Sequence, residues 1–564
     1  MVKTKRKPTQ QANAEASPPS LKERLAQKRK AERIRKELIT FTTFSLLFCA
    51  VVGFVAALAG GPKVGVGVTV GLLCTSLSFK YPRHALWAFL IYLPFGGTIT
   101  YSLGNSPLLQ LAKDGFYIPA LFGVVQFCRR EQLPLLVPKR LVPPLIILLT
   151  FCMLTLIFVN GNQQLHPHIG TAVNAVLQAQ VSDKPPEYPL GMGILGLKVL
   201  LGYVPLIICS YYLIRNRKDL MFLMRLTVVL VLICCALAFI QYLFLKTGRC
   251  EGTRFEEGAD LFKASLNARC FVGGSLLYSP EFGQIRLPGT FVAPWQWGWF
   301  LISSGFLAFA PAFNDPKPYW RTLGLASMAA VVVMSVLSGQ RIALAIVPVT
   351  FILLLVLTGQ IIYLKRFIPT AVGLSLLLGV LAVTNPEVLQ ERTDSFVARW
   401  NASPPQQFIM DQIKWALSQQ DGFLGNGLGR ATNAARALGE TQLIETYYPK
   451  LMYEIGPFGT LAFLAVVTML TYLTFKAYRS VRDTRLRPYG AAMWLFVLFV
   501  SYNTYYYPLD VDPVAVYYWF FAGVILKLPE IERQERLEAA EQEKLSAEAS
   551  SKKKKRLKRG RAFA

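Results

Sequence analysis

The sequence predicts an all-α protein, a polytopic bundle of about 12 to 14 transmembrane helices with long extracytoplasmic loops. Hydrophobic residues make up 53% of its 564 residues, and the mean hydropathy is +0.38. These residues stand in continuous blocks of roughly 18 to 25, close to the length that crosses the hydrocarbon core of a bilayer. Backbone groups in lipid must be satisfied internally, and continuous apolar blocks indicate helices where alternating residues would indicate a barrel.

Much of the net charge of +27 comes from basic runs in two tails, residues 1–37 and residues 529–564: one run extends from Lys3 to Lys36, and the other is SKKKKRLKRGR near Arg561. In a soluble protein this charge would suggest nucleic acid. Beside a membrane domain, basic runs are typical of the cytoplasmic side, where each basic residue gains roughly 1 kcal/mol from anionic lipid headgroups. We therefore expect two cytoplasmic tails, membrane lipids as partners and no nucleic acid. The polar N-terminal stretch is too long for a cleaved signal peptide.

Residues 38–528 form the predicted transmembrane domain. With the N-terminus inside, the short loops predicted to be cytoplasmic are rich in Lys and Arg, as the positive-inside rule requires, and the C-terminus is also inside. The predicted spans are about 39–60, 64–79, 85–103, 115–128, 141–160, 193–213, 220–245, 291–310, 322–338, 342–363, 367–384, 451–475, 489–505 and 513–527.

The same topology places three long loops outside, at about 161–192, 246–290 and 385–450. Loops of this length are usually functional or disordered. A fourth outer segment, the Tyr-rich 501–512, is predicted to be an interfacial aromatic belt. Only Cys250 and Cys270 share a loop, and a disulfide between them is plausible outside the cytoplasm.

Few ionisable residues fall inside the predicted spans. Lys113, Asp114, Arg225 and Glu454 are the main ones, and we expect them near span ends or paired within the bundle. Their scarcity argues against a proton relay across the bilayer. With three histidines and no CxxC or HxxxH pair, the sequence predicts no metal site, and nothing in it calls for a cofactor.

Two arginines stand at the predicted outer face. Arg286 precedes LPGTF and opens a span, and Arg341 follows LSGQ in a short turn between two spans. Either side chain could simply snorkel to the headgroups. However, the positive-inside rule disfavours an arginine in a short outer turn. A guanidinium fork suits bidentate contact with phosphate, so the pair predicts a diphosphate clamp.

A third motif returns the chain to the same face. The sequence GNGLGR, at 425–430, lacks the preceding strand of a nucleotide-binding loop and is interpreted as a flexible loop closing onto the bilayer. The stretch ETYYPKLMYEIGPFG follows, with Glu445, Tyr447 and Tyr448 at the return to the membrane.

Together these motifs resemble the O-antigen ligase and Wzy-type polymerase superfamily of bacterial polytopic glycosyltransferases. Its members have an arginine before a GTF-like element, an S-x-S-R-like motif at an outer helix end, and a long outer loop ending in GxGxG, HNxxL and ExG. The resemblance covers roughly residues 200 to 475. The matching residues are Arg286 with Gly289 to Phe291, Ser338 with Arg341, Gly425, Gly427 and Gly429, and Glu454 with Gly456.

The resemblance implies transfer of a glycan from a polyprenyl diphosphate carrier to a sugar hydroxyl, at the outer face of the bacterial cytoplasmic membrane. Arg286 and Arg341 would bind the diphosphate, with Tyr447 and Tyr448 as further substrate-binding residues. Where the ligases carry the HN histidine as candidate base, this chain has Glu445, followed by Thr446. A carboxylate can act as a base if burial raises its pKa. We therefore favour a polymerase and Glu445 as the base.

The sequence also allows other assignments of the base and of the function. Glu445 could merely cap or pair at the end of its loop, and His166 and His168 are other candidate bases. The protein could be a ligase, or a transporter of a small anion or of the lipid-linked glycan. It could also be a scaffold that uses its basic tails. The resemblance further implies a flippase and a chain-length regulator as partners, by analogy.

Overall fold

The computed structural model describes residues 21–103, 112–135, 138–165, 187–256, 268–279, 284–360, 386–420 and 422–561, together with Gly379 and Val383. The protein is 78% helical with almost no sheet, which confirms the all-α prediction. By contacts the chain divides into two units, Met1–Lys80 and Tyr81–Ala564. The predicted span 367–384 lies almost entirely outside the described residues.

The first unit is a helical hairpin. Helix α1 (Leu21–Gly60) turns at Gly61, which has a φ of +85°, into α2 (Pro62–Lys80). The two helices approach closely at glycines. A Cβ on Gly53 would lie 2.8 Å from the carbonyl oxygen of Gly65, and a Cβ on Gly65 would lie 2.6 Å from that of Gly53. Small residues at such a crossing are typical of helix pairs in lipid, where close packing supplies the attraction.

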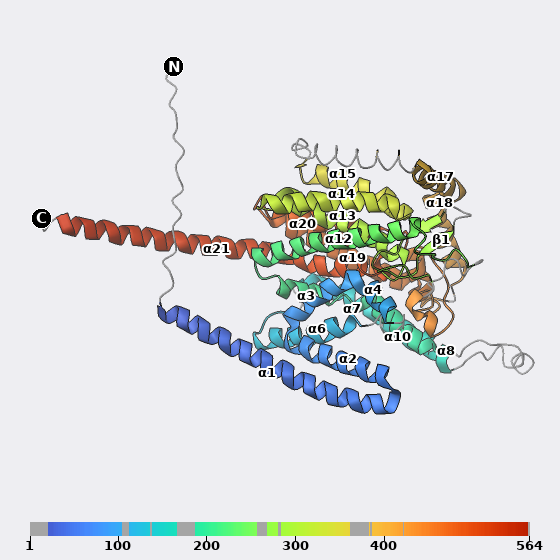
Figure 1. The fold of residues 1–564 in the computed structure, drawn as a ribbon, viewed down its shortest axis with the longest axis horizontal. Helices are drawn as coiled ribbons and strands as arrows, with labels where there is room; N and C mark the ends of the chain where they lie inside the picture. The colour runs from blue at the N-terminus through green and yellow to red at the C-terminus, as the bar shows by residue number, and fades with distance from the viewer. Residues whose placement is uncertain are drawn as a thin grey trace, which may run out of the picture. The chain divides into compact units, whose positions relative to one another are not determined.

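The second unit contains the other described elements, shown in Figure 1. Its only described sheet pairs two short strands antiparallel, with Leu277 opposite Arg286. The elements are α3 (Pro82–Tyr92), η1 (Leu93–Phe95), α4 (Gly96–Ser102), α6 (Asp114–Arg130), η2 (Lys139–Leu141), α7 (Val142–Leu154), η3 (Thr155–Asn160), α8 (Gly161–Leu165), α10 (Pro189–Leu201), α11 (Leu206–Leu213), α12 (Arg217–Lys246), β1 (Leu277–Ser279), β2 (Gln284–Arg286), α13 (Pro294–Asn314), α14 (Pro318–Leu337), α15 (Arg341–Leu357), α17 (Pro386–Ala402), α18 (Pro405–Ser418), η6 (Asn433–Ala437), α19 (Tyr447–Ser480), α20 (Arg487–Tyr502), η7 (Pro508–Asp510) and α21 (Val514–Arg561).

Seven helices in the described part of the chain are long and apolar enough to cross a membrane. Two shorter apolar helices, Val64–Lys80 and Arg341–Leu357, accompany them. The class predicted from the sequence, a polytopic helical membrane protein, agrees with these helices. The seven are Arg35–Gly60, Lys139–Leu165, Pro189–Leu213, Arg217–Lys246, Pro318–Leu337, Tyr447–Ser480 and Val514–Ala547.

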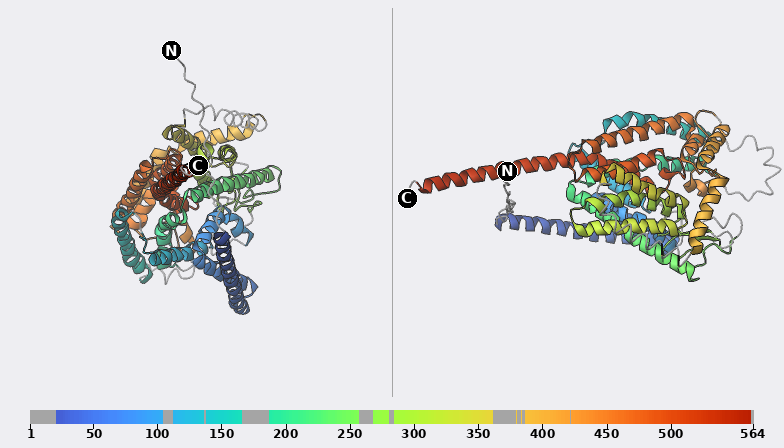
Figure 2. Two further views of the ribbon diagram at one scale, coloured as in Figure 1. Left: turned by 90° about the vertical axis from the view of Figure 1, so that its left-hand side faces the viewer. Right: turned by 90° about the horizontal axis from the view of Figure 1, so that it is seen from above.

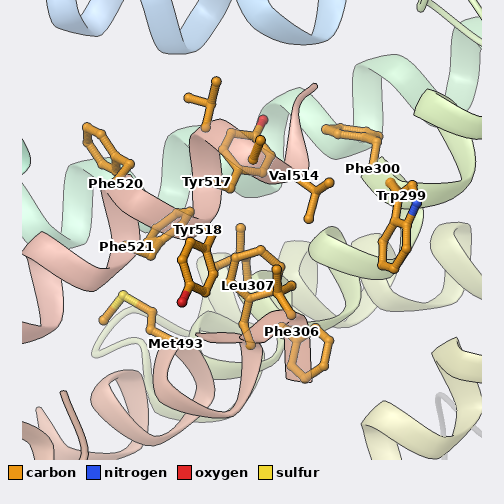
Figure 3. Packing of buried hydrophobic residues seen from close by; sticks show 14 of the residues in the cluster. Trp299, Phe300, Phe306, Leu307, Met493, Val514, Tyr517, Tyr518, Phe520 and Phe521 are labelled. Carbon is orange, nitrogen blue, oxygen red and sulfur yellow. The ribbon is translucent and has the colours of Figure 1, made fainter. Parts of the chain in front are cut away.

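Helix α13 lies at the centre of the packing of the second unit. Every residue from Trp297 to Phe313 is buried. Figure 3 shows Phe306 and Leu307 of this helix in one buried cluster with Met493 of α20 and with Tyr517, Tyr518, Phe520 and Phe521 of α21. Phe306 packs against Phe496 with ring centroids 5.6 Å apart. Lipid tails are as apolar as these side chains, so van der Waals complementarity, more than transfer from water, favours this packing in a bilayer.

Polar contacts join the basic loops at one end of the second unit. Arg217 pairs with Asp483 and with Glu535, the latter at 2.7 Å. Arg83 pairs with Asp219 at 2.6 Å. These loops lie where α21 leaves the bundle, while β1, α17 and α18 lie at the opposite end (Figures 1 and 2). We call the two ends the basic end and the loop end.

The ionisable residues predicted inside the bundle all have polar partners. Lys113 pairs with Asp512, and Asp114 with Lys198 at 2.8 Å. The Arg225 guanidinium makes two 2.8 Å hydrogen bonds to the Asp315 carboxylate. The Glu454 carboxylate accepts from the backbone of Ala431 and the hydroxyl of Thr432. Pairing offsets the high cost of desolvating each charge, as the sequence predicted.

Candidate functional site

The segments that carry Arg286 and Arg341 meet through their backbones. The N–H of Leu287, directly after Arg286, donates to the carbonyl oxygen of Ser338 at 3.0 Å. Arg286 ends β2, and Arg341 is the first residue of α15. The turn between α14 and α15 includes Gly339, whose φ of +69° suits glycine. Both arginine side chains are half-buried and have partners.

The PGT turn after Arg286 is held from two sides. The N–H of Gly289 donates to the Gln241 side chain at 3.1 Å, and Gln241 Nε2 donates to the carbonyl oxygen of Cys270 at 2.8 Å. Gly289 has a φ of +56°, and a Cβ there would lie 2.5 Å from the Trp297 ring. Conformation and close approach therefore both require glycine in the GTF-like element.

A disulfide joins Cys250 to Cys270, which are 20 residues apart in sequence, with Cα atoms separated by 5.5 Å. The pairing that the sequence made plausible is therefore present. Since the carbonyl of Cys270 accepts from Gln241, the cross-linked loop is connected directly to the support of the PGT turn.

The first two turns of α13 contact the two arginine-bearing segments and also the segment around Tyr506. A Cβ on Gly298 would lie 3.3 Å from the side chain of Gln340, the residue before Arg341. One residue further on, Trp299 Nε1 donates to the carbonyl oxygen of Tyr506 at 3.1 Å. The turn before Arg341 and the segment around Tyr506 therefore contact adjacent positions of one helix.

The backbone of Glu445 is hydrogen-bonded to the segment around Tyr506. The N–H of Tyr506 donates to the carbonyl oxygen of Glu445 at 2.9 Å, and Thr446 forms a bridge with Tyr505. Glu445 is half-buried, one residue before the N-cap of α19. The structure thus connects the Glu445 segment with the arginine-bearing segments through α13, at the loop end.

Tyr447 and Tyr448 form the first turn of α19. Tyr447 is 1% exposed, and its ring packs against Phe463 with centroids 5.5 Å apart. The Tyr448 hydroxyl donates to the carbonyl oxygen of Ser501. Both rings therefore contribute to packing, and their predicted contact with substrate stays a prediction.

The segment 503–513 differs from the predicted interfacial aromatic belt. It folds inward, with Leu509 and Val511 buried. Thr504 caps α19, since its carbonyl and hydroxyl oxygens accept from the N–H groups of Tyr447 and Tyr448 at 2.6 and 3.3 Å. Because those N–H groups have no partner inside their own helix, the cap comes from another part of the chain.

Sequence reasoning missed two charged residues here, Lys450 and Asp510, which form a buried ion pair. A signal was available, because a lysine stands in the apolar first turns of a span and two acids alternate in the apolar sequence PLDVDP.

The GNGLGR loop is tightly held rather than the flexible loop predicted from the sequence. Gly425, Gly427 and Gly429 have φ angles of +72°, +112° and +81°. The Asn160 side chain accepts from the N–H of Leu428 at 2.9 Å and donates to its carbonyl oxygen at 3.0 Å. The glycines are thus required by a compact turn packed on one asparagine.

Arg430, the last residue of that motif, is held by neighbouring side chains. Its guanidinium donates to Glu187 at 2.9 Å and twice to Gln163, at 3.1 and 2.9 Å. Glu454, from the ExG-like motif, is 2% exposed and accepts from the same loop. Gly456, with φ +72° and ψ 177°, interrupts α19 just after it. These motif residues therefore have a structural explanation.

Several buried polar groups near the candidate site have no hydrogen-bond partner within the described part of the chain. They are Trp297 Nε1, Ser338 Oγ, Gln340 Nε2 and Thr446 Oγ1. Two of them, in Ser338 and Gln340, lie in the turn before Arg341, and Trp297 lies against Gly289 of the PGT turn. All four groups can donate a hydrogen bond, so an acceptor-rich ligand such as phosphate would complement them.

Among the described residues, no group of three or more His, Cys, Asp or Glu side chains is placed to hold a metal ion. His166 and His168, the alternative bases, lie outside the described residues. The chain matches no model of a protein family, and it matches no curated protein.

Proposed function

We propose that this protein is a membrane glycosyltransferase that polymerises glycan units from a polyprenyl diphosphate carrier for cell-surface polysaccharide. The observation that carries the proposal is the backbone contact between Leu287 and Ser338, because it joins two arginine-bearing segments in one region. The Glu445 segment reaches the same helix, α13, through Tyr506. This transfer needs residues that bind the diphosphate and a base that accepts the proton of the hydroxyl. The two arginines and Glu445 are the candidates.

In the reaction, an oxygen of the acceptor hydroxyl attacks the anomeric carbon of the donor sugar. The bond from that carbon to the diphosphate oxygen breaks, and its electron pair leaves with the diphosphate. Glu445 accepts the proton of the attacking hydroxyl. Arg286 and Arg341 stabilise the charge that develops on the leaving group, through charge-assisted hydrogen bonds.

The proposed orientation has the basic end in the cytoplasm and the loop end outside. The clustered Lys and Arg loops support it through the positive-inside rule, and the Cys250–Cys270 disulfide supports an oxidising location for the loop end. In its finer form, we propose that the chain crosses the bacterial cytoplasmic membrane about 12 to 14 times and that both termini are in the cytoplasm. A flippase and a chain-length regulator are the proposed partners.

A ligase is the second form of the same proposal, since transfer to a different acceptor hydroxyl would use the same donor site. Glu445, where the ligases have a histidine, favours polymerase. The size distribution of the product distinguishes the two forms, because a ligase changes the acceptor of the chains while a polymerase changes their length.

The test is Arg341→Ala in cells whose only copy carries it, at matched protein level. Surface and released polysaccharide are sized on a gel, and lipid-linked units are extracted. We expect long glycan to fall on the order of a hundredfold while short lipid-linked units accumulate, because one transition-state donor is lost. Arg249→Ala is the matched control, since Arg249 follows α12 in a loop predicted to be outside and its guanidinium lies 5.2 Å from the centroid of the Phe244 ring.

Two other outcomes would replace the proposal. Unchanged glycan with altered uptake of an anion would indicate a transporter. Loss of glycan on deleting residues 529–564, with no effect of Arg341→Ala, would indicate a scaffold that works through its basic tail.

A further inference from the structure

The segment 503–513 carries two acids, and each pairs with a lysine from a different element. Asp510 pairs with Lys450, in the first turns of α19. Asp512 pairs with Lys113, directly before α6. The side chain of Lys450 is only 2% exposed and that of Asp510 only 10%, so this pair is the more buried.

The Lys450–Asp510 pair closes a ring of contacts around Glu445. The chain runs from Glu445 into the first turn of α19, where the N–H of Lys450 donates to the carbonyl oxygen of Thr446 at 3.1 Å. The ion pair then crosses to Asp510. From there the segment leads back to Tyr506, whose N–H donates to the carbonyl oxygen of Glu445 at 2.9 Å.

Stability alone does not explain this pair. Two charges lose much of their attraction to the cost of leaving water, and apolar residues of similar volume often serve as well or better. An ion pair differs from an apolar contact in its direction, because the ammonium and the carboxylate must face one another. Such a contact specifies the register between α19 and segment 503–513.

We propose that Lys450 and Asp510 are a positioning pair for Glu445, holding its backbone in register with Tyr506 so that the carboxylate faces the acceptor hydroxyl. This inference rests on the proposed function. Lys450 is buried against Asp510 and acts through Glu445, without contact with the substrate.

The same segment provides a matched control. The Lys113–Asp512 pair joins the segment to the residue directly before α6, and no described hydrogen bond joins this pair to the Glu445 segment. Neutralising either pair removes one anion from segment 503–513 and one cation from the element that it contacts. Only neutralising the Lys450–Asp510 pair breaks the ring of contacts around Glu445.

The experiment compares Lys450→Met/Asp510→Asn with Lys113→Met/Asp512→Asn in full-length protein. Both partners are changed together because a lone buried charge would destabilise the fold. Undecaprenyl diphosphate serves as the binding probe. Lipid-linked units extracted from Arg341→Ala cells serve as donor for turnover. Melting in detergent reports on folding.

For the Lys450 double variant we expect binding of the probe and melting close to wild type, KM within about twofold, and kcat lower on the order of a hundredfold. Lys450→Arg, which keeps the ion pair, should retain most of kcat. The Lys113 double variant should retain kcat.

Wild-type kcat in the Lys450 double variant would overturn the inference. So would an equal fall in both double variants, which would indicate a general effect of the segment. If wild-type protein transfers no glycan and Arg341→Ala cells accumulate no units, the proposed function fails instead, and the two failures are distinguishable.

Discussion

The N–H of Leu287 donates to the carbonyl oxygen of Ser338 at 3.0 Å, so a backbone hydrogen bond connects the two segments that carry Arg286 and Arg341. Neither arginine side chain takes part in this bond. Substituting an arginine should therefore leave the junction in place, and its effect should report on what the guanidinium binds.

Arg341→Lys should lower polysaccharide formation by about tenfold or more, because lysine keeps the charge but loses the bidentate fork. Glycan formed per cell at matched protein level is the measurement, with Arg249→Lys as the control. Equal output from Arg341→Lys and wild type would show that the site needs only a positive charge.

Gln340→Met should raise the melting temperature in detergent while weakening binding of undecaprenyl diphosphate. The Nε2 of Gln340 is buried without a described hydrogen-bond partner, and burying such an unsatisfied group lowers the stability of the fold by about 1 to 3 kcal/mol. Methionine has a similar shape and removes that cost. A rise in melting temperature with unchanged binding would mean that Nε2 contributes nothing to the ligand.

Thr504→Val should destabilise the protein by about 1 kcal/mol, because the N–H of Tyr448 loses its hydroxyl acceptor while the carbonyl cap of Tyr447 remains. Thermal melting is the measurement. Thr247→Val is the control, since the Thr247 hydroxyl donates only to carbonyls of its own helix. Equal shifts in the two variants would argue against the cap.

The basic end should lose stability in acid through Asp483. Burial alone would raise the pKa of this carboxyl, but hydrogen bonds from Arg217 and the backbone N–H of Arg485, with the Arg217 charge, hold the pKa below its usual value. A depressed pKa contributes stability above the unfolded value of about 3.9, and this stability is lost as pH falls through the folded value.

Asp483→Asn should therefore melt below wild type at pH 6, and the difference should shrink as pH falls below about 4. Melting curves of both proteins across this range are the measurement. A constant difference would show that the carboxyl makes no pH-dependent contribution.

The sequence predicted helices wherever apolar blocks were long, because composition alone determines that behaviour in lipid. It also predicted that Arg225 and Glu454 would lie near span ends or be paired within the bundle, and both have polar partners. The meeting of the Arg286 and Arg341 segments agrees with their assignment to one face.

Other features depend on partners distant in sequence. The side chains of Asn160 and Gln241 bind backbone groups of the glycine loop and the PGT turn. Every residue except proline has the same backbone groups, so the sequence does not show which of them a distant side chain binds. For the same reason the inward fold of segment 503–513 was missed. Its tyrosines are equally typical of a membrane interface.

Gly425 and Gly456 face each other across the glycine loop and the interruption of α19. A Cβ on Gly425 would lie 2.6 Å from the backbone nitrogen of Gly456, and a Cβ on Gly456 would lie 2.0 Å from the carbonyl oxygen of Phe423. Each also has a φ of +72°. A change at one cannot be compensated at the other, because each is constrained by its own backbone. Such a contact can only be invariant or absent, so among related chains it would produce no correlated substitutions, and methods that infer contacts from covariation would not detect it.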